Sequence, residues 1–289
     1  MGVNVRATLL SRDPSRFKAE VPHLGLRPEF DWVVGEPAGF AAPTGGFDYL
    51  IDFATPSAAE VGAAGTAIVE HCLQGSANLL SFAKTAGVRR VLYASSGAVY
   101  GRQPDNVERL TEDFATDPAT VSPYGRLKQR SEALLLGSGL DCVIARGFAF
   151  IGPYLPLTDK FAAGSFLRDA LAGGPIVING DGRATRSYLH AADLTIWLLT
   201  LLTRGTPGHV CNVGSEQAVS MLELAGRISA CSTPGLRVDL RGSPGAESVG
   251  NYVPNISRAK TELGLLARIP LDAAIRQTLD WHLAKHDRA

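Results

Sequence analysis

The sequence has no excess of charge, few cysteines and no long hydrophobic run. Lys and Arg number 28, as do Asp and Glu, so nothing indicates a basic footprint for nucleic acid or an acidic tail for basic partners. The longest apolar run, 194–202, is too short to cross a bilayer, and no apolar run follows a basic region at the start. We therefore expect a cytoplasmic protein with no nucleic-acid or membrane partner.

The cysteines are few and scattered, without Cys-x-x-Cys spacing. Each lies in an apolar context, such as LDCVIAR or GHVCNVG. This pattern favours small core residues in a reducing compartment over disulfides or a metal site, so we expect no metal. The four are Cys72, Cys142, Cys211 and Cys231.

The first half alternates short β-branched runs with longer helical patterns, which is typical of parallel βαβ units. Helices are expected at 66–87 and 124–139, where apolar residues recur at three- and four-residue spacing and glycine follows. The result should be an α/β fold with a doubly wound parallel sheet. The predicted strands are 5–11, 30–34, 49–54, 90–96 and 141–148.

After Gly152 the sequence becomes rich in turns. SMLE, 220–223, is a capping box for a helix to about Ala230, and a loop at 241–255 precedes a last helix from Asp272 to about Lys285. We therefore divide the chain into a sheet domain, 1–150, and a smaller lobe, 151–289, mainly for substrate, some of whose segments return to the core.

SPYGRLKQR places Tyr124 four residues before Lys128. On a helix the two share a face, so the ammonium can lie near the phenol, favour the phenolate and lower a pKa that is ordinarily near ~10. A half-buried tyrosine over a solvated lysine stem is the alternative that the spacing alone leaves open.

The segment YASSGAVYG ends a buried strand with two hydroxyls before a glycine, where ligands of parallel sheets bind. This segment, Tyr-x-x-x-Lys and RGFAFIGP together resemble the extended short-chain dehydrogenases of the NAD-dependent epimerase/dehydratase group, which act on nucleotide sugars. The resemblance runs from about Val5 to the last helix. It implies a Rossmann-like domain and a catalytic trio of Ser96, Tyr124 and Lys128, with Ser96 also on the substrate and Tyr124 and Lys128 also at the cofactor.

The resemblance extends into the second half. NGDGRATRSYLHAADL is similar to a family segment in which an arginine, here Arg186, meets the sugar-nucleotide diphosphate; a surface arginine is the alternative. Ser165 and Phe166 would border the nucleotide. His190 and Asp193 open the next helix and are expected to be structural rather than ligands.

The sequence departs from the family pattern at positions of which one pair bears on the type of reaction. Gly97 and Ala98 stand where the 4,6-dehydratases have an acidic pair, which favours epimerase or simple oxidoreductase chemistry over dehydration. Asp52 stands where many members have histidine, a change with no consequence that the sequence alone explains.

The family's first strand and Gly-x-x-Gly-x-x-Gly loop have no counterpart here. The first strand, from Val5, resembles the family's second, so the central strand of the sheet is expected to be missing. Gly62-x-x-Gly65 lies beyond the third strand and is interpreted as a helix entry. Arg12 and Ala54 are the remaining candidates for cofactor contact, and Arg12 favours NADP over NAD only weakly because Asp13 follows it.

Two classes of function are consistent with these residues. The first is an NAD(P)-dependent nucleotide-sugar epimerase or oxidoreductase with Tyr124 as acid and base. The second is a family member that uses no dinucleotide, either a cofactor-free acid/base enzyme or a non-catalytic binding protein. The resemblance also implies a homodimer whose four-helix interface uses 75–86 and 124–136, with burial inside the monomer as the alternative.

Overall fold

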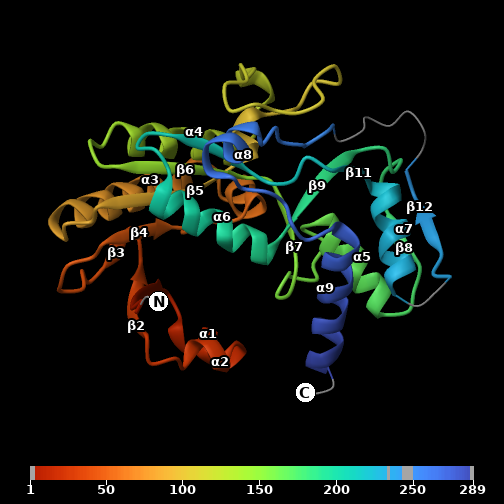
Figure 1. The fold of residues 1–289 in the computed structure, drawn as a ribbon, viewed down its shortest axis with the longest axis horizontal. Helices are drawn as coiled ribbons and strands as arrows, with labels where there is room; N and C mark the ends of the chain where they lie inside the picture. Colours follow the sequence, from red (N-terminus) through yellow and green to blue (C-terminus); the bar gives the residue numbers. More distant parts are fainter. Residues whose placement is uncertain (1–3, 233–234, 243–249, 287–289) are drawn as a thin grey trace.

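The computed structural model describes residues 4–232, 235–242 and 250–286. A parallel sheet of strand order β10-β6-β5-β4 lies at its centre (Figure 1). In register, Asp52 at the end of β4 lies beside Tyr93 of β5, and Ser96 at the end of β5 lies beside Gly147 of β6. The strands are β4 (Tyr49–Asp52), β5 (Arg90–Ser96), β6 (Cys142–Gly147) and β10 (Val210–Val213).

Helices cover both faces of this sheet because successive side chains of a strand point to opposite sides. Val91 and Tyr93 of β5 pack in a core with residues of α3 and α4, whereas Leu92 packs in another with residues of α6 and α8. The doubly wound α/β prediction is therefore confirmed. These helices are α3 (Ala58–Thr85), α4 (Pro123–Leu136), α6 (Ala191–Arg204) and α8 (Ser257–Leu263).

The N-terminal elements form a separate small sheet, set apart from the central one in Figure 1. Strand β1 pairs in parallel with β2, and in the described part of the chain no ladder joins either to β4. The sheet therefore stays in two pieces where a central strand was expected to be missing. The elements are β1 (Ala7–Ser11), α1 (Pro14–Glu20), α2 (Pro22–Gly25), β2 (Phe30–Glu36) and β3 (Gly39–Phe40).

The turn between β2 and β3 attaches this N-terminal unit to α3. The Asn78 side chain donates to the carbonyls of Pro37, at 3.2 Å, and Ala38, at 3.0 Å. Pro37 also packs so closely on Gly75 that a Cβ there would lie 2.8 Å from the Cβ of Pro37. Contact with α3 thus fixes the small sheet at its β2–β3 end.

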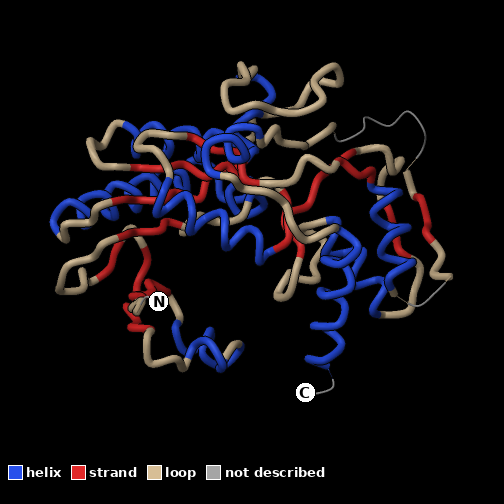
Figure 2. The backbone as a smooth tube through the Cα atoms, in the orientation of Figure 1, coloured by secondary structure: helices blue, strands red, loops and turns tan. Residues whose placement is uncertain are grey.

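The C-terminal lobe combines short strands, loops and three helices (Figures 1 and 2). Its core joins residues of α5, α7 and α9 to strand residues such as Ile151 and Ile176. The predicted capping box of Ser220 and Glu223 is present, whereas the middle of the loop predicted at 241–255 lies outside the described residues. The elements are β7 (Ala149–Ile151), α5 (Ala162–Leu171), β8 (Ile176–Ile178), β9 (Thr185–His190), β11 (Ala218–Ser220), α7 (Met221–Cys231), β12 (Val238–Leu240) and α9 (Leu271–His286).

The sequence did not predict the lobe strands, of which β7, β8, β11 and β12 have three residues each and β9 has six. They form the β11-β9-β7 and β12-β8 sheets, and β7 is parallel to β9 while β11 is antiparallel to it. Three-residue strands carry too little alternation to be distinguished from loops. No helix in the described residues combines the length and apolarity needed to span a membrane.

Candidate active site

Ser96 lies at the carboxyl end of β5, where the strand turns into a 3₁₀ helix, Gly97–Tyr100. Its Oγ accepts from the Ala98 amide at 3.1 Å and so caps that helix. The turn comes very close to α4, since a Cβ on Gly125 would lie 2.3 Å from the Ala98 carbonyl oxygen. This close approach of the two backbones brings the first turn of α4 against the end of β5.

Tyr124 occupies that first turn of α4. Ser122 caps the helix by accepting from the Gly125 amide at 3.1 Å, and Pro123 supplies a backbone suited to helix entry. Burial raises the pKa of the Tyr124 phenol above its ordinary value, and a hydrogen bond with Ser96 opposes that rise. The tertiary structure therefore brings the two predicted hydroxyls together.

Lys128 is buried, with 2% of its surface exposed, so the solvated-lysine alternative is wrong. Its Nζ donates to Thr55 Oγ1 at 2.8 Å and to the Ala94 carbonyl at 2.6 Å, and lies 5.8 Å from the Tyr124 ring centroid. Burial lowers its pKa to about 8, although Asp52 and Glu132 act in the opposite direction. Because the ammonium is directed at Thr55 and Ala94, the expected lowering of the Tyr124 pKa is wrong for this arrangement.

Tyr252 is a third hydroxyl at this site, and sequence reasoning missed it. Its OH lies 3.5 Å from Ser96 Oγ and donates to the Gly147 carbonyl at 3.4 Å. A Cβ on Gly97 would lie 2.6 Å from the same OH, so Tyr252 fills the space beside that glycine. Burial raises the pKa of Tyr252 to about 12. No local pattern signalled this role, since Tyr252 lies in a predicted loop far from the motifs.

Ser96, Tyr124 and Tyr252 form a hydroxyl cluster at this site. Arg186, on β9, lies against the Tyr252 ring and so borders this cluster. Its guanidinium carbon lies 5.7 Å from the Tyr252 ring centroid, and Nη1 donates to the carbonyls of Thr185, at 2.8 Å, and Gly250, at 2.7 Å. Burial lowers the pKa of Arg186. Arg186 is therefore partly buried and held by backbone carbonyls, while contact with a diphosphate stays a prediction.

The two residues predicted on α5 are less accessible. The Phe166 side chain is 4% exposed and lies in the lobe core, whereas Ser165 is half-buried and accepts from Arg168 at 3.5 Å. His190 caps α6, and Asp193 accepts from the amides of Arg268 and Ile269 at 2.9 Å, so both are structural as expected.

A buried ion pair joins α4 to the sheet next to Lys128. Arg146 of β6 donates to both carboxylate oxygens of Glu132, at 3.0 and 2.7 Å, and Ser95 of β5 donates to the same carboxylate. Arg146 also donates to the Tyr100 hydroxyl at 2.9 Å. Glu132 lies one helical turn beyond Lys128, so this pair sets how the Tyr124–Lys128 face sits on the sheet.

A profile of the NAD dependent epimerase/dehydratase family matches residues 36–214. The chain belongs to this family. It is similar to UDP-glucuronic acid decarboxylase 1 of Arabidopsis thaliana, at 29% identity over 69% of this chain and 46% of that protein. It also resembles UDP-N-acetyl-alpha-D-glucosaminuronate decarboxylase of Bacillus cytotoxicus, at 25% identity over 74% of this chain and 70% of that protein. The match spans about half the length of the first of these relatives.

The fold is that of solved epimerase/dehydratase structures. UDP-glucose 4-epimerase of Thermotoga maritima, determined with UDP-glucose, superposes with a TM-score of 0.83 at 19% identity, covering 97% of this chain and 92% of that one. The Bordetella bronchiseptica enzyme WbmF, in complex with NAD+ and UDP, gives a TM-score of 0.80 at 22% identity, with 99% and 86% covered. The Rossmann-like prediction is thereby confirmed.

The residues of this family member fit a dinucleotide at one end of the expected site only. At the end where a nicotinamide ribose is expected, Lys128 Nζ lies 5.8 Å from the Tyr124 ring centroid, so the two polar side chains are close together. At the other end, the turn after β1 contains Arg12, the helix cap Asp13 and the buried Pro14, which give bulky side chains where a diphosphate needs close backbone approach.

The other cofactor candidates lie near the start of α3. Arg12 is exposed, and its charge adds to the lowering of the Glu60 pKa, which is due first to hydrogen bonding with Ser57. Ala54 is exposed and its amide donates to Asp52 at 2.9 Å. Gly65 interrupts α3 with φ 69° rather than preceding it, so no glycine-rich cradle forms there.

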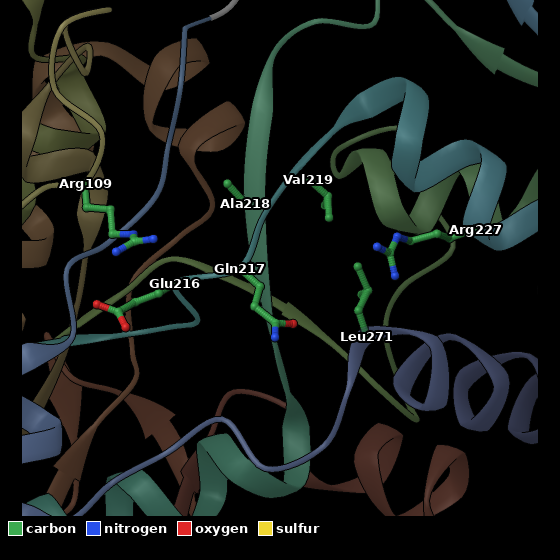
Figure 3. A pocket seen from close by; sticks show the side chains of 7 residues that line it. All are labelled: Arg109, Glu216, Gln217, Ala218, Val219, Arg227 and Leu271. Carbon is green, nitrogen blue, oxygen red and sulfur yellow. The ribbon is translucent and has the colours of Figure 1, made fainter.

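A hollow of about 600 Å³ lies between the sheet domain and the lobe (Figure 3). Arg109 and Arg227 point toward it from opposite sides, around Gln217. Arg227 is held by Asp272 at 2.9 Å. The lining contains none of the predicted site residues, so this hollow is distinct from the hydroxyl cluster.

Proposed function

We propose that this chain acts on a nucleotide-linked sugar, with Tyr124 as acid and base and Ser96 as the hydrogen-bond partner of the same sugar hydroxyl. The observation that carries the proposal is the close approach of the first turn of α4, which contains Tyr124, to the carboxyl end of β5, which contains Ser96, beside the buried Lys128. Family membership and relatives named for UDP-sugars support the substrate class.

The residues would divide the work as follows. Ser96 holds the reacting hydroxyl, and Tyr124 removes its proton, a transfer that a positioned group accelerates by roughly 10²–10⁴-fold. Lys128 supplies positive charge near the phenol. Tyr124, Lys128, Arg12 and Ala54 are the residues that would hold NAD or NADP, and the bound cofactor would supply the hydride-transfer chemistry that an epimerase or oxidoreductase needs.

Epimerase or oxidoreductase chemistry fits the residues around Ser96 and Tyr124 better than dehydration. The space beside Gly97 holds the Tyr252 hydroxyl, and burial raises the pKa of that phenol to about 12, so it is a much weaker acid than a carboxyl group. Arg186, in contact with the Tyr252 ring, would contact the diphosphate. The half-buried Ser165 would lie toward the nucleotide, whereas Phe166 is buried in the lobe core and would support that wall from behind.

A second candidate is a family member without a dinucleotide. The divided sheet and the glycine-free turn after β1 favour it. In that case Ser96 and Tyr124 would serve proton transfer alone, or the pocket would only bind a nucleotide sugar.

Calorimetric titration with NAD+, NADP+, their reduced forms, UDP-glucose and UDP-glucuronic acid distinguishes the two candidates. Micromolar dinucleotide binding with turnover supports the redox proposal. Nucleotide-sugar binding without dinucleotide binding supports the second candidate and contradicts hydride transfer.

Tyr124→Phe tests the acid/base role in whichever reaction is found. We expect a loss of about 100-fold or more in turnover with the fold intact, because only the phenolic hydroxyl is removed. Tyr49→Phe is the control, since Tyr49 begins β4 at the opposite end of the sheet and is 40% exposed. Equal turnover in the two variants would remove Tyr124 from the mechanism.

A further inference from the structure

Asp52 is a buried carboxyl group at the carboxyl end of β4, with 5% of its surface exposed. Carboxylates are rarely buried without compensation. One of its oxygens accepts from the Ala54 amide at 2.9 Å. Because Asp52 and Tyr93 are register partners on neighbouring parallel strands, their side chains project from the same face of the sheet, the face that α3 and α4 cover.

The Lys128 ammonium reaches that face from α4. Its Nζ lies 4.5 Å from the Tyr93 ring centroid and donates to Thr55 Oγ1, three residues beyond Asp52. The segment that leaves β4 therefore brings both the Asp52 carboxyl group and the Thr55 hydroxyl to the face of the sheet that the ammonium enters. Burial raises the pKa of Asp52 and lowers that of Lys128, and each of the two groups opposes the shift of the other.

The other ionisable groups around Lys128 are less suited to balance its charge. Glu132 of α4 already binds Arg146 at 2.7 Å. Burial raises the pKa of the Cys72 thiol on α3, and it raises that of the Tyr93 phenol on β5 far above its ordinary value, so both are neutral. Tyr124 on α4 is likewise a protonated phenol.

We propose that Asp52 is a positioning residue for Lys128: its carboxylate keeps the buried ammonium charged, and Thr55 fixes its direction. The proposal rests on the proposed function only for its catalytic meaning, since a neutral amine at position 128 would supply no positive charge to the Tyr124 phenol. It gives a role to a residue that departs from the histidine common in the family. It also means that Lys128 is ordered by the chain's own groups before any ligand binds.

The test is an NMR titration of protein labelled with ¹³C at lysine Cε, with the Lys128 resonance assigned by its loss in Lys128→Met. In Asp52→Asn we expect the Lys128 midpoint to fall by about one pH unit or more, because burial then disfavours the charge without a carboxylate to oppose it. Asp52→Glu should keep the midpoint near the wild-type value. No substrate or cofactor is needed, so this result is independent of whether the proposed function holds.

Asp141→Asn is the matched control. Asp141 is a part-buried carboxylate that precedes β6 at the other end of the sheet, where it accepts from Arg90 at 2.8 Å. Its loss should leave the Lys128 midpoint unchanged. An unchanged midpoint in Asp52→Asn, or an equal fall in both variants, would overturn the proposal.

Thr55→Val provides a second variant if Asp52→Asn does not fold. It removes a hydrogen-bond acceptor of the ammonium while keeping side-chain shape and the Asp52 carboxylate. We expect the midpoint to fall in the same direction by a smaller amount, together with a change in the Lys128 Cε shift below the midpoint. A Lys128 resonance identical to that of the wild type would contradict the role of Thr55.

Discussion

At the scale of single residues, the candidate site depends on glycines whose missing side chains leave space for the side chains of neighbouring residues. Gly97 is an example, because an added Cβ would lie 2.6 Å from the Tyr252 hydroxyl and 2.8 Å from Phe148. The absence of a side chain at position 97 and the presence of Tyr252 are therefore one feature. An acidic side chain at position 97 would therefore collide with Tyr252 and Phe148 unless these residues moved.

Gly97→Ala should destabilise the protein by about 1–3 kcal/mol, because the new methyl group overpacks the Phe148–Tyr252 contact. Tyr252→Phe in the same chain should recover part of the loss by removing the nearest atom. Thermal unfolding measures both. Gly226→Ala is the control, since no atom lies within 4 Å of that Cβ position on α7. Equal stability of Gly97→Ala and the wild type would contradict this packing.

At the scale of elements, helix α4 carries two residues of the candidate site and also the ion pair that attaches the helix to the sheet. Tyr124, Lys128 and Glu132 follow one another at four-residue spacing, and the last of these is tied to Arg146 of β6. One helix face thus holds Tyr124, the proposed acid/base residue, the buried Lys128 ammonium and Glu132, which attaches the helix to the sheet. A shift of α4 would move all three together.

Glu132→Gln should cost about 3–5 kcal/mol in the free energy of unfolding, because it leaves the Arg146 charge buried without a counter-charge. The matched change Glu70→Gln breaks an ion pair in which the Arg130 side chain is 53% exposed and the Glu70 side chain 67% exposed. It should cost about 0–1 kcal/mol. Urea unfolding compares the two. Similar losses would show that the Glu132–Arg146 pair is not specially buried.

Lys128 also makes stability depend on pH. Its pKa is lowered from 10.5 to about 8, so between these values the unfolded chain holds a proton that the folded chain has lost. Stability from this group therefore rises with pH over that window, by up to about 3 kcal/mol. Urea unfolding should show that the free energy of unfolding of the wild type, relative to that of Lys128→Met, is larger at pH 10 than at pH 8. A constant difference would contradict the lowered pKa.

At the scale of the whole molecule, the sheet is divided. Strand β5 has a partner on each side, whereas β1 has β2 alone among the described residues. The small sheet is also held to α3 at its β2–β3 end through Asn78. The N-terminal unit should therefore open independently of the core.

Hydrogen exchange tests this division. The amides of 7–11 should exchange roughly 100-fold or more faster than those of 91–95, because β1 can open without unfolding the central sheet. The measurement is mass spectrometry of the free chain. Equal protection of the two strands would mean that the two sheets unfold as one unit.

Local pattern was sufficient for the fold class and for part of the site. The alternation of strands and helices predicted the doubly wound sheet, and strand-end Ser96 with the Tyr124–Lys128 spacing predicted the hydroxyl pair. This works because parallel strands end at one edge of a sheet and a helical repeat puts the residues at i and i+4 on one face. Local pattern did not predict the lobe strands, because their pairing depends on partners that are distant in sequence.

The sequence by itself determined which groups this protein has to work with: two hydroxyls, a lysine, and no glycine-rich turn after its first strand. Only the tertiary structure decided where they point. It turned Lys128 toward Thr55 and Ala94, placed Tyr252 beside Gly97, joined Glu132 to Arg146 and left the sheet in two pieces. The reason is physical: burial and contacts between distant segments set direction and pKa, and neither is written in local spacing.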